Sequence, residues 1–139
     1  MLYDAPMKWA ERHATGIRQL DDQHKMLFRM AEDFRAALDE GKGEGAYENL
    51  LQSLDLYVRT HFRYEEGCME RYACPAAEVN QKAHRKFEET LSGFQKRYAS
   101  RGFDSTDGRE LVDTLDSWLD GHIGRLDSQL KKLVEQAGA

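Results

Sequence analysis

The stretch LDDQHKMLFRMAEDFRAALDE, residues 20–40, decides the fold class of this chain. Its apolar side chains recur every three or four residues, which is the spacing of one face of an α-helix. These side chains are Leu20, Leu27, Phe28, Ala31, Phe34 and Leu38, and His24 falls on the same stripe. The glycine-rich GKGEG at 41–45 ends the pattern. The sequence therefore predicts an amphipathic helix over about residues 18–40.

Three further segments show the same helical spacing, over about residues 45–72, 76–99 and 106–136. Short stretches rich in turn-forming residues separate them, among them ACP at 73–75 and SRGFDSTDG at 100–108. Four long helices with short connections favour an all-α fold, an antiparallel up-down-up-down four-helix bundle. Residues 1–17 would form an arm packed on the bundle. The length of 139 residues fits one domain.

Charge and composition argue against several classes of function. The net charge of -5 comes from interspersed acids and bases, so no basic stripe suits nucleic acid and no polybasic patch suits a membrane surface. No apolar run reaches the roughly 18 residues of a spanning helix, and the first residues lack the layout of a signal peptide. We therefore expect a cytoplasmic protein. Cys68 and Cys74 match neither CxxC nor zinc-finger spacing, and we interpret them as reduced thiols.

Each predicted helix carries a histidine or a carboxylate on its apolar stripe, where an unpaired polar group costs several kcal/mol. These residues are His24, then His61 and Glu65 on the second helix, His84 on the third and His122 on the fourth. One such histidine alone is more often a hydrogen-bonded core residue, and His61 with Glu65 could be an ordinary i,i+4 pair. Four of the 5 histidines, however, fall on these stripes, one on each helix. Imidazole and carboxylate on facing helices form a donor set for iron or another first-row transition metal.

Asp127 is harder to place by spacing. It follows His122 by five residues, which is about 140° around an ideal α-helix, so regular periodicity would not put both side chains on one metal. A local π-bulge would bring them together, and such bulges favour functional sites. The large apolar residues on the stripes are most simply explained as core packing.

Three motifs, in order and at matching intervals, resemble the hemerythrin family and in particular its single-domain bacterial members. GIRQLDDQHKMLF at 16–28 resembles G-I-x-x-I-D-x-Q-H-K-x-L-F, and HFRYEEGCM at 61–69 resembles H-F-x-x-E-E-x-x-M. WLDGHIGRLD at 118–127 resembles W-L-x-x-H-I-x-x-x-D. The resemblance covers nearly the whole chain and implies a single hemerythrin-like domain over residues 1–139.

The same resemblance implies a non-haem, carboxylate-bridged centre of two iron ions. Its ligands would be His24 and His61 on one iron, His84 and His122 on the other, and Glu65 and Asp127 as bridges between them. It also implies an apolar oxygen pocket beside the iron of His24 and His61. The walls of that pocket would be Leu27, Phe62, Trp118, Leu119 and Ile123.

The third helix departs from the family pattern of Y-P followed by H-x-x-x-H. Here YACPAAEVNQKAH at 72–84 inserts two residues into Y-P and puts Asn80 where the first histidine belongs. In the family that histidine completes the iron that does not bind oxygen. Asn80 Oδ1, water or a nearby carboxylate such as Glu88 would fill the position here. An amide oxygen is a weak neutral donor, so we expect a looser or more open site.

The function that the resemblance implies first is reversible binding of dioxygen for storage, delivery or sensing, without turnover. Dioxygen would be the partner, and the sequence indicates no protein partner. An alternative is an oxidase or peroxidase that reacts with oxygen, peroxide or nitric oxide, made possible by an open position at Asn80. A third is a bundle that binds one metal or stores iron. Because six of the seven expected ligands are present, we favour oxygen binding over an enzyme.

Overall fold

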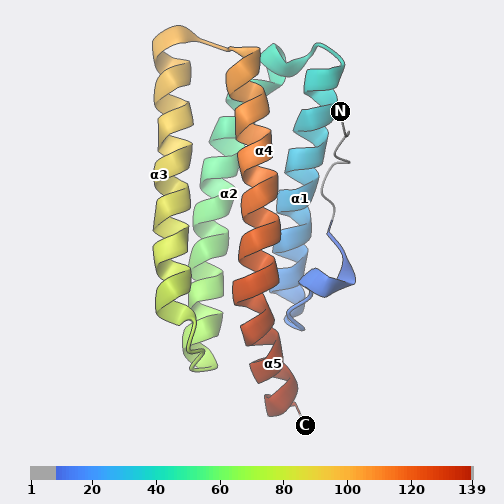
Figure 1. Ribbon diagram of the computed structural model, residues 1–139, viewed down its shortest axis with the longest axis vertical. Helices are drawn as coiled ribbons and strands as arrows, with labels where there is room; N and C mark the ends of the chain where they lie inside the picture. The colour runs from blue at the N-terminus through green and yellow to red at the C-terminus, as the bar shows by residue number, and fades with distance from the viewer. Residues whose placement is uncertain (1–8, 139) are drawn as a thin grey trace.

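The chain folds into an antiparallel bundle of four long helices (Figure 1). The computed structural model describes residues 9–138, except for the side chains of Leu126 and Asp127. A 3-10 turn, η1, spans Glu11–His13 and precedes α1 (Arg18–Asp39), α2 (Gly43–Arg71), α3 (Ala77–Arg101) and α4 (Ser105–His122). A π-helical turn, η2 (Ile123–Asp127), joins α4 to its continuation α5 (Ser128–Ala137). The described residues contain no strand, so the predicted all-α four-helix bundle is confirmed.

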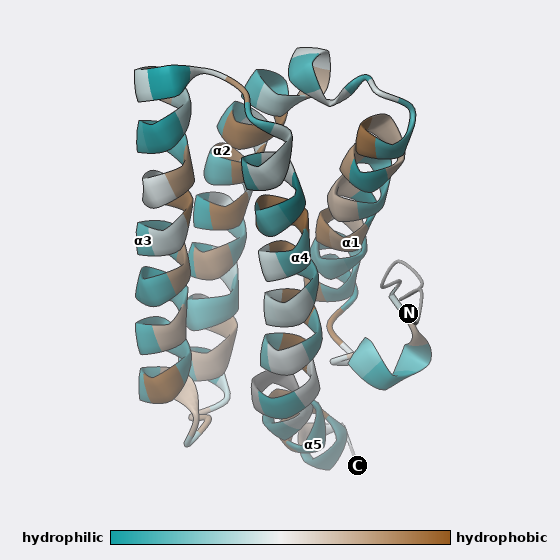
Figure 2. Cartoon of the chain, turned by 45° about the horizontal axis from the view of Figure 1, so that its top comes forward, coloured by the Kyte–Doolittle hydropathy of each residue, from teal (hydrophilic) through white to brown (hydrophobic). Residues whose placement is uncertain are grey.

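A main apolar core holds the helices together along their inner faces, and a second, smaller cluster contains Leu20, Met69 and Leu130. Apolar and hydrophilic segments alternate along each helix, as an amphipathic sequence requires (Figure 2). Fully buried members of this core include Leu27 in α1, Leu54 in α2, Leu91 in α3 and Leu115 in α4. Each such side chain contributes about 1.5–3 kcal/mol by leaving water. In the described part of the chain, no helix is both long enough and apolar enough to cross a membrane.

The helices end where the local sequence predicts. The Asp104 side chain caps α4 by accepting a hydrogen bond from the Thr106 backbone N–H at 2.7 Å. Gly102 ends α3 with a φ of 76°, a conformation that glycine adopts without strain. Pro75 lies between α2 and α3, where it interrupts neither helix.

The described part of the N-terminal arm, residues 9–17, is fixed to the bundle at α1 and α4. The ring of His13 is buried and packs on Phe28 in α1, with ring centroids 4.9 Å apart. His13 Nε2 lies 3.3 Å from Asp120 Oδ1, and Arg12 donates a hydrogen bond to the same oxygen at 2.9 Å. The expected arm is therefore present over these residues, and its first eight residues lie outside the described ones.

Two leucines of α2 offer a matched test of the core. Leu54 is 0% exposed, whereas Leu56 is 70% exposed. We expect Leu54→Ala to lower the free energy of unfolding of the metal-free protein by about 2–5 kcal/mol, because a cavity is left behind. We expect Leu56→Ala to change it by less than about 0.5 kcal/mol. Urea unfolding followed by circular dichroism measures both, and equal effects would contradict the position of Leu54.

Candidate metal centre

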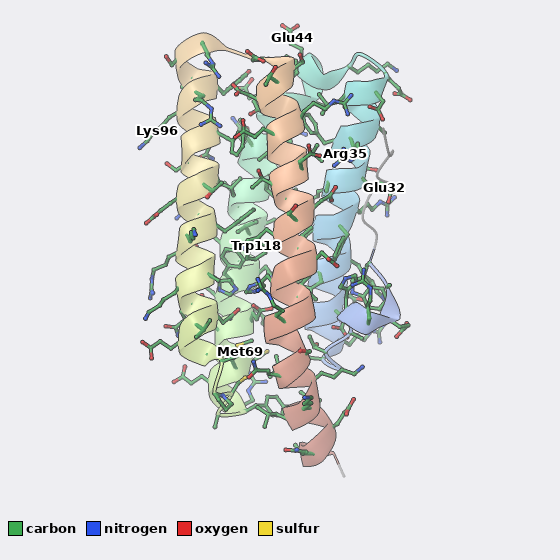
Figure 3. The ribbon with its side chains drawn as sticks, in the orientation of Figure 1. Glu32, Arg35, Glu44, Met69, Lys96 and Trp118 are labelled. Carbon is green, nitrogen blue, oxygen red and sulfur yellow. The ribbon has the colours of Figure 1, made fainter. Side chains whose placement is uncertain are left out.

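A layer of polar side chains interrupts the apolar core in the half of the bundle that holds Trp118 and Met69 (Figure 3). All four long helices contribute to it. The layer contains His24 from α1, His61 and Glu65 from α2, His84 from α3 and His122 from α4, all of them buried. Because each residue lies on the inner stripe of its helix, packing of the four stripes brings the side chains together. The structure thus assembles five of the six residues expected as ligands.

Glu65 lies at the centre of this layer, and its two carboxylate oxygens face different histidines. Oε1 is 2.8 Å from His84 Nε2 and 3.1 Å from His122 Nε2. Oε2 is 3.1 Å from His24 Nε2 and 3.8 Å from His61 Nε2. Two donors at ~2.1 Å from one metal ion and at right angles to each other lie ~3.0 Å apart. These distances therefore fit two metal positions that share Glu65, in agreement with two groups of possible ligands.

Hydrogen bonds at the outer edge of the layer set the tautomers of two histidines. His61 Nδ1 lies 2.8 Å from Gln23 Oε1, and His84 Nδ1 lies 2.7 Å from Glu66 Oε2. Both partners are acceptors, so each Nδ1 carries the hydrogen and each Nε2 directs a lone pair toward the layer. A ligating histidine usually has this arrangement, in which the outer partner fixes the ring.

The nitrogen and oxygen atoms crowded around Glu65 Oε1 need a proton or a metal cation between them. His84 Nε2 and His122 Nε2 lie 3.1 Å apart, and both are within 3.1 Å of that oxygen. His61 Nε2 and His122 Nδ1 are buried without a hydrogen bond to a described residue. Lone pairs that converge in a buried space repel one another unless a cation or added protons lie among them. The residues present therefore fit a bound metal.

Burial and hydrogen bonding set the charges of the layer. Desolvation lowers the pKa of His61 to about 3 and also lowers the pKa of His122. Burial alone would raise the pKa of Glu65, but hydrogen bonds that His122 and His24 donate in the metal-free layer outweigh burial and hold this pKa well below its usual range. At pH 7 the layer then contains neutral imidazoles at His61 and His122 and an ionised carboxylate. These are the protonation states that metal binding requires.

The metal-free protein is expected to lose stability in mild acid. The pKa of His61 is about 3 in the folded chain, against an ordinary value of 6.5. Between pH 6.5 and pH 3, His61 is therefore protonated in the unfolded chain but not in the folded one. Stability therefore falls as the pH falls, by about 2 kcal/mol between pH 7 and pH 5. The lowered pKa of Glu65 acts in the same direction below the ordinary value of 4.5. Urea unfolding at the two pH values measures the loss, and equal stability would contradict a buried neutral His61.

Comparison with known proteins identifies the family. A family model described as "Hemerythrin HHE cation binding domain" matches residues 15–134. The chain belongs to the hemerythrin family. A bacteriohemerythrin of Pseudomonas aeruginosa (strain LESB58) is 31% identical over 119 residues, which cover 86% of this chain and 75% of that protein. A myohemerythrin of Theromyzon tessulatum is 25% identical over 126 residues, 91% of this chain and 92% of that protein. The family predicted from the three motifs is confirmed.

The backbone of this hemerythrin-family chain has an unusual turn between His122 and Asp127. Residues Ile123–Asp127 form the π-helical turn η2. The i→i+5 repeat of a π-helix brings residues five positions apart toward the same side of the helix. The structure thus contains the π-bulge that joint ligation by His122 and Asp127 would require. The side chain of Asp127 lies outside the described part of the chain, so its role as a second bridge stays a prediction.

Asn80 occupies the position where the family pattern has a histidine. It lies one turn before His84 in α3 and is 0% exposed. Neither Oδ1 nor Nδ2 of its side chain has a hydrogen-bond partner among the described residues. A buried polar atom without a partner costs about 1–3 kcal/mol. A metal ion or water that binds the amide would remove this cost.

Two of the five residues expected as oxygen-pocket walls, Phe62 and Trp118, contact histidines of the polar layer. Leu27, Phe62, Leu119 and Ile123 are buried in the main core, and Trp118 packs against that core. The Phe62 ring stacks on His84 with centroids 3.8 Å apart, and the Trp118 ring stacks on His122 at 4.3 Å. The expectation placed both rings beside His24 and His61, but the Phe62 ring turns toward α3 and lies 5.8 Å from His61. The two aromatic residues thus contact mainly the other histidine pair.

The sequence did not predict a role for Gln23 and Glu66, which contact two of the expected ligands. Each directly precedes or follows a predicted ligand, and each is part of a motif that carried the family resemblance. Their hydrogen bonds to His61 and His84 depend on helix rotation and on side-chain rotamers, which spacing does not specify. Only the positions of Gln23 and Glu66 inside the family motifs could have indicated a role for them.

Proposed function

We propose that this protein binds two non-haem iron ions and takes up dioxygen reversibly, in storage, delivery or sensing. The main support is Glu65, because its two oxygens each face a separate pair of histidines. Further support comes from the relatives, which include a bacteriohemerythrin and a myohemerythrin, and from a family described as cation-binding. The proposal includes the cytoplasmic location expected from the sequence.

The residues in and around the polar layer would have different roles in this function. Two ferrous ions, when bound, would supply the two electrons that dioxygen takes up. The proposed ligands are His24 and His61 for one ion, His84 and His122 for the other, and Glu65 and Asp127 as bridges. Gln23 and Glu66 would hold the rings of His61 and His84 through their Nδ1 atoms. Buried Leu27, Leu119 and Ile123 would keep water out of the layer.

Admission of air to the reduced, iron-loaded protein tests this proposal. We expect a visible absorption band that appears with oxygen, disappears under vacuum and returns over repeated cycles. A single irreversible change to the oxidised protein would reject reversible binding. Iron analysis tests the count separately, since about two ions per chain are expected and a value near one would reject the two-metal centre.

Asn80 favours a second candidate function, an oxidase or peroxidase that reacts with oxygen, peroxide or nitric oxide. Its buried amide has no hydrogen-bond partner in the part of the chain that the structure describes, and an amide binds iron more weakly than imidazole does. A cleft between α3 and α4 also reaches His122, on the proposed second metal position. An exchangeable position on that metal would admit a further ligand. Sustained consumption of hydrogen peroxide by the loaded protein would support this function, and one stoichiometric reaction would support oxygen binding.

A further inference from the structure

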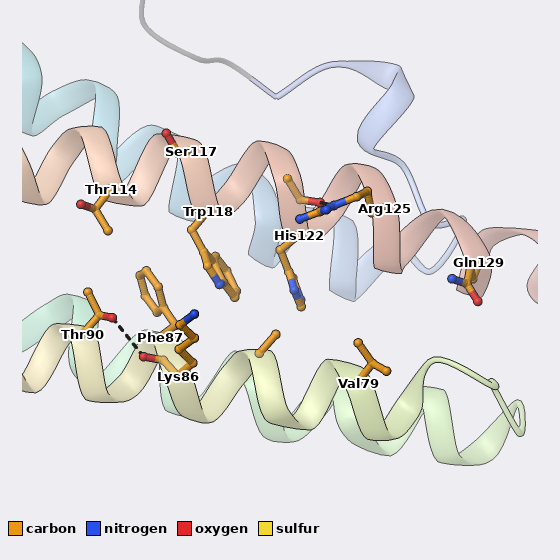
Figure 4. Close-up of a pocket in the computed structure, with 12 residues that line it drawn as sticks. Val79, Lys86, Phe87, Thr90, Thr114, Ser117, Trp118, His122, Arg125 and Gln129 are labelled. Atoms are coloured by element: carbon orange, nitrogen blue, oxygen red, sulfur yellow. Dashed lines mark hydrogen bonds between the residues drawn. The ribbon is translucent and has the colours of Figure 1, made fainter.

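A cleft of about 600 Å³ lies between α3 and α4 (Figure 4). These two helices are joined by fewer close approaches than the other neighbouring pairs of the bundle. Small residues, Ala83 in α3 and Gly121 in α4, line the opening. The volume lies within the range of roughly 300–1,000 Å³ that is usual for small-molecule sites.

Two aromatic rings form one wall of the cleft. Phe87 from α3 and Trp118 from α4 have ring centroids 4.4 Å apart, and Trp118 is half-buried. Trp118 in turn stacks on His122 with an angle of 12° between the rings. His122 also lines the cleft, and its Nδ1 is buried without a hydrogen bond to a described residue. The wall thus offers flat aromatic surface.

The charge of the cleft is opposite to that of the whole chain. The sequence has 25 acidic against 20 basic residues. The described side chains that line the cleft nevertheless include Lys86 and Arg125 and no carboxylate. Arg125 Nε donates a hydrogen bond to the Gly121 carbonyl at 3.3 Å, and neither cation forms an ion pair with a described residue. Both positive charges can therefore bind an anion.

We propose that this cleft binds a small aromatic carboxylate of one or two rings. The ring would pack against Phe87 and Trp118, which supply apolar and stacking contact. The carboxylate would lie near Lys86 and Arg125, and their charges favour it over a neutral or cationic analogue. This function goes beyond oxygen binding, because it requires no metal. An occupant would touch Trp118 and so adjoin a proposed metal ligand, His122.

Titration calorimetry of the full chain with 2-naphthoate tests the proposal, in metal-free and iron-loaded protein. We expect one saturable site of similar affinity in both forms. Lys86→Glu should weaken binding at least about fivefold, since an attraction becomes a repulsion. Lys82→Glu is the matched control, because Lys82 lies one turn earlier on α3, is 71% exposed and does not line the cleft. It should leave binding within about twofold.

Two further measurements test the importance of the carboxylate and of the open cleft for binding. We expect 2-naphthalenemethanol to bind at least about fivefold more weakly than 2-naphthoate. Ala83→Trp should abolish binding by filling the cleft, with circular dichroism as the check on folding. Absence of saturable binding up to about 10 mM would overturn the proposal, as would equal binding by Lys86→Glu or by the neutral analogue. Binding that occurs only with iron and ignores Lys86→Glu would place the anion on the metal and also overturn it.

Discussion

Replacement of Glu65 by glutamine is expected to lower the affinity for iron by at least about a hundredfold. In the native chain one carboxylate oxygen faces His84 and His122, and the other faces His24 and His61. Glutamine keeps the shape but removes the charge, and its NH2 group turns a donor toward one of the histidine pairs. Iron per chain in competition with a chelator measures the effect, and we expect a fall from about two to below one.

A series of carboxylates on α2 provides the controls for this variant. Glu66 accepts the hydrogen of His84 Nδ1 at 2.7 Å, so Glu66→Gln should cost about 10- to 100-fold in affinity. Glu70 is exposed, and Glu70→Gln should have no effect. Iron affinity should therefore increase in the order Glu65→Gln, Glu66→Gln, Glu70→Gln. Retention of two ions at native affinity by Glu65→Gln would contradict its place as a bridge.

The bundle and most of its polar layer could be predicted because both depend on the same periodicity. An α-helix that buries one face must repeat its apolar residues every three or four positions, as Leu27 and Phe28 do with Ala31. A histidine on that stripe is buried together with them. His61 and Glu65, four residues apart, therefore share a face before any tertiary contact is known. Packing of the four stripes then joins these residues to the other histidines.

Other features could not be predicted from spacing because they depend on small rotations of the helices and on local backbone geometry. The sequence between His122 and Asp127 fits a regular α-helix as well as a π-turn. Spacing alone therefore did not decide whether Asp127 faces the same side as His122. The cleft between α3 and α4 also depends on the rotation of the helices. Ala83 and Gly121 are ordinary small residues in sequence, and only the rotation of α3 and α4 places both at one opening.

Replacement of Asn80 by histidine is expected to slow the autoxidation of the iron-loaded, reduced protein by about tenfold. Asn80 is fully buried one turn before His84, and its amide has no hydrogen-bond partner among the described residues. An imidazole there would be a stronger donor to the metal ion proposed at His84 and His122. It would also close the position through which water or a second ligand reaches that metal. The rate of loss of the oxygen-dependent absorption band measures the change.

Two control variants separate a restored ligand from a general effect of substitution. Asn80→Ala removes the amide and leaves the position open, so its autoxidation should be at least as fast as that of the native protein. Lys82→His adds an imidazole at a residue that is 71% exposed on the same helix, and it should leave the rate unchanged. Slower autoxidation in Asn80→His alone would place residue 80 against the metal. Equal rates in the native protein, Asn80→His and Asn80→Ala would mean that residue 80 does not touch it, and the case for an open second metal would then lose its basis.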